Sequence, residues 1–156
     1  MMGTPQFEVF ISGATSSVDD WKRAMSAPES ELPELDAQQK EVARRMDIPE
    51  KEYARGVLVQ KYGELRQRER GQRLGARIDE ILDGLGARYK LDAVIREGTK
   101  FRWVVRILTP QEPKNIAVPL DLADDVIDSA TTQDLEKLRQ AILEGLGRKD
   151  LLGNVQ

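Results

Sequence analysis

Residues 89–108 read YKLDAVIREGTKFRWVVRIL, two runs in which apolar and polar side chains alternate on either side of a turn at 97–99. Alternation with a period of two is typical of β-strands that bury one face. Directly opposed residues of an antiparallel pair lie on the same face, so the apolar sets of the two runs must oppose each other. Pairing Ile95 with Phe101 and Ala93 with Trp103 meets this condition. The stretch therefore predicts a β-hairpin with a three-residue loop centred on Gly98.

This register divides the hairpin side chains between two faces. The apolar face is expected to form a core with a later strand and the C-terminal helix, made of Tyr89, Leu91, Phe101, Trp103, Val105, Ile107, Ile116, Val118, Leu138 and Ile142. The opposite face is expected to carry Lys90, Asp92, Val94, Arg96, Lys100, Arg102, Val104 and Arg106. Five cations against one anion on one side of a hairpin indicate a basic surface.

A long helical pattern precedes the hairpin. Apolar residues recur at steps of three and four from about residue 50 to residue 85, and Gly84 and Gly86 mark its end. Residues 66–73, RQRERGQR, contain no apolar side chain. That stretch is either a solvent-spanning part of one helix or a break near Gly71.

Shorter elements are predicted on both sides of these two features. Asp36 with Gln39 forms a capping-box signature for a helix over 37–46, with Val42 and Met46 on its buried stripe. Further elements are expected as a strand over 7–11, a helix opening at Val18 with Ser16 or Ser17 as its cap, an exposed linker over 26–35, a strand over 115–120 and a helix capped by Thr131 or Thr132.

Together these elements predict an α+β fold: a long helical hairpin plus a small antiparallel sheet of three to four strands, backed by a C-terminal helix. At 156 residues, one domain is the expectation. Its helical part would span about 36–86 and its hairpin, strand and helix part about 87–147.

The residue types that are missing restrict the chemistry. The chain has no His and no Cys, so it offers no zinc finger, no haem or iron–sulfur ligation by these residues, no thiol nucleophile and no His general base. Asp121, Asp124, Asp125 and Asp128 would share one face if 121–128 is helical. We interpret them as a solvated or arginine-paired acidic face rather than a metal site. We therefore expect no metal and no cofactor.

Location follows from the same kind of reasoning. The first residues lack the basic and apolar regions of a secretory signal, and no stretch approaches the roughly 20 apolar residues that cross a bilayer. We therefore expect a cytoplasmic protein that does not enter membranes.

Charge is distributed unevenly along the chain. Residues 1–52 carry six basic and eleven acidic groups, residues 53–110 thirteen and seven, and residues 111–156 five and nine, which gives net charges of −5, +6 and −4. Either the basic middle is neutralised by the acidic ends, or it binds an anionic partner.

Residues 38–53, QQKEVARRMDIPEKEY, combine a helix carrying Ala43, a short turn and the start of a second helix. This stretch resembles the helix-turn-helix family of DNA-binding proteins. Val42, Ala43, Met46, Ile48 and Tyr53 fall where that motif keeps apolar residues to lock its two helices together. The resemblance implies a DNA-reading function for the second helix.

Two hypotheses for function follow. The first is a non-enzymatic protein-interaction protein, an adaptor or assembly subunit, that forms homo-oligomers through Leu58, Leu65 and Leu74 of its long helix. The alternative is a nucleic-acid-binding accessory protein. Its candidate contacts are Arg66, Arg68, Arg70, Arg73 and Arg77 on the helix, with Lys90, Arg96, Lys100, Arg102 and Arg106 on the hairpin.

Overall fold

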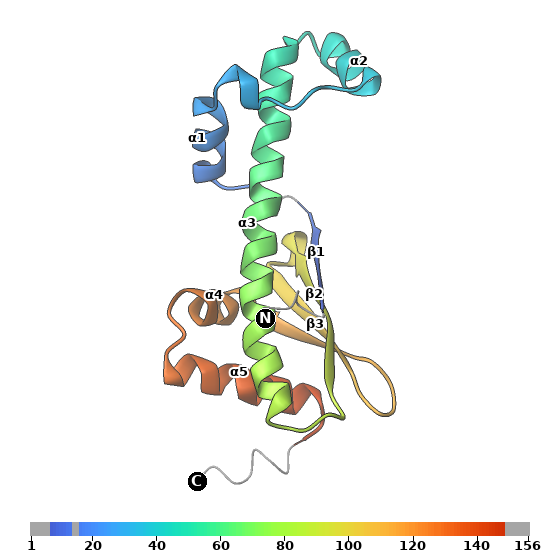
Figure 1. The fold of residues 1–156 in the computed structure, drawn as a ribbon, viewed down its shortest axis with the longest axis vertical. Helices are drawn as coiled ribbons and strands as arrows, with labels where there is room; N and C mark the ends of the chain where they lie inside the picture. The colour runs from blue at the N-terminus through green and yellow to red at the C-terminus, as the bar shows by residue number, and fades with distance from the viewer. Residues whose placement is uncertain (1–6, 14–15, 149–156) are drawn as a thin grey trace. The chain divides into compact units, whose positions relative to one another are not determined.

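The computed structural model describes residues 7–13 and 16–148, and the fold is of the α+β class (Figure 1). Its elements follow in the order β1 (Glu8–Ser12), α1 (Val18–Ser26), η1 (Glu29–Glu31), α2 (Ala37–Arg45), α3 (Glu50–Asp83), β2 (Lys90–Glu97), η2 (Gly98–Lys100), β3 (Arg102–Leu108), β4 (Lys114–Pro119), α4 (Leu120–Asp128) and α5 (Thr132–Gly145). The predicted class, the long helix, the sheet and the C-terminal helix are confirmed.

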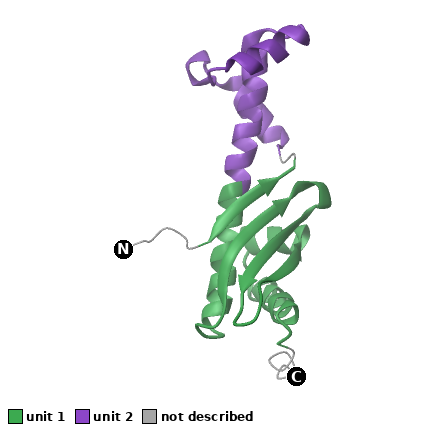
Figure 2. Ribbon diagram, turned by 90° about the vertical axis from the view of Figure 1, so that its right-hand side faces the viewer, with its two compact units in different colours: residues 1–13, 68–156 green, residues 14–67 purple. Residues whose placement is uncertain are grey.

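The chain divides into two compact units (Figure 2). Unit 1 comprises residues 1–13 and 68–156, and unit 2 comprises residues 14–67. Helix α3 contributes residues 68–83 to unit 1 and residues 50–67 to unit 2. The expectation of a single domain stays a prediction.

Unit 1 contains a four-stranded sheet in the order β1-β2-β3-β4. Strand β1 pairs with β2 in parallel, whereas β2, β3 and β4 form an antiparallel meander. Parallel neighbours need a long connection, and the helices between β1 and β2 provide it. The sheet is therefore mixed, with the N-terminal strand added to the predicted antiparallel part.

The core of unit 1 lies on one face of this sheet. Residues 68–83 of α3, together with α4 and α5, cover that face (Figure 1). Trp103 of β3 is fully buried there, between side chains of the strands and helices. The predicted core residues Leu91, Trp103, Val105, Ile107, Ile116, Val118, Leu138 and Ile142 are all buried.

Two glycines bring α3 close to the sheet. The helix runs without a break through the apolar-free stretch 66–73. A Cβ atom added at Gly71 would lie 2.6 Å from Cγ1 of Val9 and 3.0 Å from Cζ3 of Trp103. One added at Gly75 would lie 2.4 Å from the ring of Phe7. The position that the sequence marks as a potential break is instead where the helix backbone packs against the core.

The predicted hairpin register is wrong. Trp103 lies opposite Arg96, and Ile95 lies opposite Val104, with an irregularity in the pairing between Leu91 and Ala93. This bulge reverses the alternation of faces within β2, so Val94 and Arg96 share the core face with Trp103.

Phe101 contributes to the same error. It adopts a left-handed conformation with φ of 51° after η2, and β3 begins at Arg102. Its side chain is 69% exposed instead of buried. Tyr89, which was also predicted to lie in the core, is half-buried at the edge of the core.

Unit 2 is built around residues 50–67 of α3. Its small core consists of Ala24, Ala27, Leu58 and Tyr62. Ser17 begins α1 with a reciprocal capping box to Asp20, and Asp36 begins α2 with one to Gln39. These starts confirm the predicted helices, and the predicted linker over 26–35 contains the short helix η1.

No helix among residues 7–13 and 16–148 is both long and apolar enough to cross a membrane.

Candidate interaction surfaces

The face of the sheet opposite the helices is open in the described part of unit 1 (Figure 2). Three rows of paired residues cross it from β1 to β4. The central row contains Phe10, Ile95, Val104 and Ala117; the Arg102 row contains Ser12, Glu97, Arg102 and Pro119; the Arg106 row contains Glu8, Ala93, Arg106 and Asn115. The solvent side of an antiparallel sheet is usually polar, so an apolar central row is an unusual feature.

Charged side chains flank this central row. Nε of Arg102 lies 2.8 Å from Oε2 of Glu97, and Nε of Arg106 lies 3.7 Å from Oδ2 of Asp92. The hydrogen bond from Arg102 holds the pKa of Glu97 below its usual value. The residues around Val104 line a shallow hollow of about 530 Å³. The open face is thus an apolar strip between paired charges.

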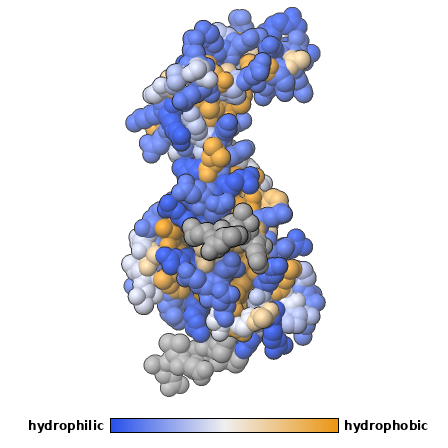
Figure 3. Space-filling view, in the orientation of Figure 1, coloured by the Kyte–Doolittle hydropathy of each residue, from blue (hydrophilic) through white to orange (hydrophobic). Residues whose placement is uncertain are grey.

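Unit 2 exposes apolar side chains on α1. Val18, Trp21 and Met25 follow each other at steps of three and four, so they lie along one side of the helix. All three are exposed, and Trp21 is 52% exposed. We call these residues the α1 stripe. Apolar residues are visible at the surface of both units (Figure 3).

The opposite side of α1 is fixed to α3. Arg66 donates to both carboxylate oxygens of Asp20 at 3.2–3.3 Å. Arg55 donates to the carbonyls of Ala24 and Ala27, both at 2.9 Å. Burial alone would raise the pKa of Asp20, but hydrogen bonds from Arg66 and Ser17 outweigh it and lower that pKa. The α1 stripe is therefore presented on a helix held by charged contacts.

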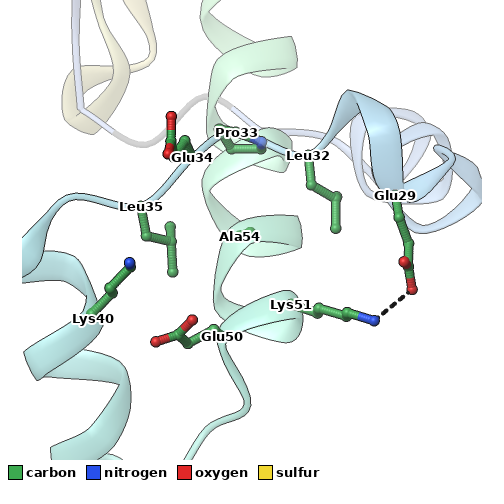
Figure 4. A pocket seen from close by; sticks show the side chains of 9 residues that line it. All are labelled: Glu29, Leu32, Pro33, Glu34, Leu35, Lys40, Glu50, Lys51 and Ala54. Atoms are coloured by element: carbon green, nitrogen blue, oxygen red, sulfur yellow. Dashed lines mark hydrogen bonds and ion pairs between the residues drawn. The ribbon is translucent and has the colours of Figure 1, made fainter.

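Unit 2 also contains a hollow, which lies beside the start of α3. Leu32, Leu35 and Ala54 form its apolar floor, and Lys51 at its rim bonds to Glu29 at 2.8 Å (Figure 4). Its volume is about 300 Å³, at the lower end of small-molecule sites. The mixed charges at its rim, Glu34, Lys40 and Glu50 among them, do not select one class of ligand.

The predicted self-association stripe on α3 is not a continuous exposed surface. Leu58 is buried in the core of unit 2 and Leu74 in the core of unit 1. Only Leu65 of the three is exposed. The reason is that α1 and the sheet already cover the apolar side of this helix. That site assignment is corrected for Leu58 and Leu74.

Most of the predicted basic contacts have carboxylate partners within the chain. Arg70 bonds to Asp124 at 2.8 Å and to Asp128 at 2.9 Å. Arg68 is exposed and donates to the carbonyl of Val9, and Lys90 is exposed at the start of β2. The remaining paired residues are Arg66 with Asp20, Arg73 with Glu69, Arg77 with Glu80, Lys100 and Arg102 with Glu97, and Arg106 with Asp92.

Arg96 does not lie on the open face. It is only 6% exposed, its Nη1 donates to the carbonyls of Glu97 and Arg102, and its guanidinium lies 5.8 Å from the ring centroid of Trp103. The bulge in β2 moves it to the core face. Its assignment as a nucleic-acid contact is therefore wrong.

The helix-turn-helix resemblance is reproduced only in part. Ala43 of α2 is fully buried, but Met46, expected on the buried stripe, is 60% exposed. Asp47 takes a left-handed turn conformation with φ of 55°. The first turn of α3 carries Glu50 and Glu52, and carboxylates there repel phosphates.

Two of the acidic residues of α4 are engaged in ion pairs. Residues 121–128 are helical as required, but Asp124 and Asp128 bond to Arg70, which lowers the pKa of Asp128. Within 7–13 and 16–148, no three acidic side chains gather around a point where an ion could bind. Burial and the neighbouring charge of Asp83 raise the pKa of Asp79.

Sequence reasoning missed the α1 stripe and the central row. A signal for the first was present, because Val18, Trp21 and Met25 are spaced along one side of a helix whose other side carries Ala24. The second depends on the bulge in β2 and on the addition of β1, and the alternation of residues does not reveal either of them.

The comparisons with known proteins give no relative. No protein-family model matches the chain, and no curated protein or solved structure matches it significantly.

Proposed function

We propose that the protein is a non-enzymatic interaction protein of the cytoplasm, an adaptor or assembly subunit, that binds a partner protein through the α1 stripe. The observation that carries this proposal is the exposure of Trp21 beside Met25 and Val18. Tryptophan is enriched among the residues that dominate binding energies, and methionine adapts to irregular apolar surfaces.

The packing of unit 2 supports the same interpretation. Its core uses two alanines, one leucine and one tyrosine, while its only tryptophan remains outside. Burying Trp21 would add one of the largest apolar areas available to any side chain. An exposed tryptophan on a helix fixed by Arg55 and Arg66 supports binding to an apolar pocket of another protein.

The nucleic-acid alternative stays a prediction. Its candidate cations are mostly paired with carboxylates of the chain, so a phosphate contact at most of them would have to displace an existing ion pair.

The test is site-specific photo-crosslinking in the full chain, with a photoreactive phenylalanine analogue placed at Trp21 in cells. The matched control places it at Lys22, which is exposed on the same helix but lies about 100° around its axis. We expect one protein to be captured from position 21 and not from position 22.

Purified partner then permits a quantitative test. Trp21→Ala should weaken binding by at least about tenfold in calorimetry, as expected for a residue that dominates an interface. Lys22→Ala should leave the affinity within about twofold. Equal capture from both positions, capture of nucleic acid only, or an unchanged affinity of the Trp21→Ala variant would each reject the proposal.

A further inference from the structure

The open face of the sheet has a property that is independent of α1: it is complementary to itself. We propose that two copies of the chain associate through this face, with a two-fold axis parallel to the strands. The inference rests on the proposed interaction function. It adds a second binding surface, the open face, and names a second copy of the chain as the partner there. It uses different residues, so either proposal can fail alone.

The register of the sheet determines which residues would face each other. A rotation about an axis parallel to the strands, midway between β2 and β3, keeps each row over the same row of the second copy. It places β2 over β3 and β1 over β4. In the central row, Phe10 then lies over Ala117 of the second copy, and Ile95 over its Val104. A large side chain meets a small one at the edges, and two branched side chains meet at the centre.

The charges fit the same arrangement. In the Arg102 row, Glu97 of one copy lies over Arg102 of the other, and the reverse pair forms by symmetry. In the Arg106 row, Arg106 lies over Ala93, so no cation faces a cation. Each Arg102–Glu97 pair keeps its own contact of 2.8 Å and gains a second opposite charge.

The other two-fold axis in the plane of the sheet is excluded by charge. An axis perpendicular to the strands would place the Arg102 row over the Arg106 row, and Arg102 over Arg106. Like charges that face each other in such a contact oppose association.

The size of the face sets the expected strength. Four strands about 4.8 Å apart and five residues of about 3.3 Å each give a footprint of roughly 300 Å² per copy. That is small compared with a standard interface. We therefore expect a reversible dimer with a Kd on the order of 100 µM.

The first experiment is sedimentation equilibrium of the full chain up to about 500 µM. The average mass should rise from 17.6 kDa toward twice that value. Val104→Glu places a carboxylate from each copy beside the axis and should keep the protein monomeric. Val18→Glu is the matched control, because it makes the same chemical change on α1 and should leave the association unchanged.

The decisive experiment mixes two charge variants. Glu97→Arg leaves two cations in the Arg102 row, and Arg102→Glu leaves two anions, so each variant alone should be monomeric. In a mixture, every facing pair has opposite charge, and a heterodimer should form at least about tenfold more strongly than either homodimer. Far-UV circular dichroism of each variant checks that it is folded.

Restored association in the mixture cannot come from repair within one chain, because each chain keeps its own defect. A wild-type chain that is monomeric throughout the concentration range would overturn the proposal. So would a mixture without heterodimers, or association lost in Val18→Glu but kept in Val104→Glu. The last result would assign self-association to the α1 stripe and leave the function proposed for that helix standing.

Discussion

Gly71→Ala tests the packing of α3 against the sheet. The added Cβ would lie 2.6 Å from Cγ1 of Val9 and 3.0 Å from Cζ3 of Trp103, well inside ordinary van der Waals contact. Val9 is branched and buried, and Trp103 is fully buried, so neither side chain can move away cheaply. Overpacking of this kind costs about 1–3 kcal/mol. The higher helix propensity of alanine stabilises the variant by about 1 kcal/mol and offsets part of this cost.

Gly56→Ala is the matched control on the same helix. A Cβ atom there meets nothing within 4 Å, so only the gain of about 1 kcal/mol in helix propensity remains. The propensity gain is common to both variants and cancels in their difference. We therefore expect Gly71→Ala to be less stable than Gly56→Ala by about 1–3 kcal/mol, a shift on the order of 1 M in the urea midpoint.

The two tryptophans make the measurement specific for each unit. Trp103 is buried in unit 1, and Trp21 is exposed on α1 of unit 2, so the fluorescence of each tryptophan reports on its own unit. Gly71→Ala should lower the midpoint reported by Trp103, and Gly56→Ala should raise the one reported by Trp21. A Gly71→Ala variant as stable as Gly56→Ala would refute the close approach of α3 to the sheet. Coincident transitions in the wild-type chain would support the single-domain prediction.

Three further changes have expected directions that urea unfolding can check. Asp20→Asn should lower the stability of unit 2 by about 1–2 kcal/mol, because the ion pair between Asp20 and Arg66 is lost; the loss is moderate because Arg66 is 36% exposed. Because the pKa of Asp20 is lowered in the folded chain, its contribution is complete above about pH 4 and is lost as the pH falls through that lowered pKa, so wild-type and variant midpoints should converge in acid. Asp79→Asn should raise the stability of unit 1 at pH 7, because burial and Asp83 raise the pKa of Asp79 and thus disfavour its ionised form. The gain should disappear once the pH is low enough to protonate Asp79. A variant less stable than the wild-type chain at pH 7 would contradict this reasoning. Phe101→Gly should raise the stability by up to about 1 kcal/mol, because a left-handed φ of 51° is unfavourable for phenylalanine and the exposed ring contributes little packing; a loss would show that the ring has contacts that matter.

The sequence predicted the elements well because their signals are local. The predicted capping box at Asp36 and the predicted cap at Thr131 lie where the structure begins α2 and α5. Alternation located β2 and β3, and the three- and four-residue steps located α3. Each of these signals involves residues within one turn or one strand, so no knowledge of distant contacts is needed.

The candidate surfaces were harder to predict because they depend on contacts between distant residues. One bulge after Leu91 moves Arg96 from the open face to the core face, and alternation alone cannot reveal the extra residue. The buried position of Leu74 requires the sheet, and that of Leu58 requires α1. A stripe of leucines on an isolated helix has the same pattern whether the chain itself or a second molecule covers it.

The segregation of charge along the chain has a consequence for what the protein binds. The basic middle finds counter-charges in both acidic ends: Arg66 pairs with Asp20, and Arg70 pairs with Asp124 and Asp128. Cations that are already neutralised add little attraction for a polyanion. Two large apolar side chains are exposed as well, Trp21 on α1 and Phe10 on the open sheet face. Apolar burial gives a negative heat-capacity change and depends weakly on salt, whereas phosphate binding is strongly salt-dependent. Binding through these surfaces should therefore persist when the salt concentration is raised. Many charges of the chain pair with each other within the fold, and the exposed side chains of the two surfaces that would contact a partner are largely apolar.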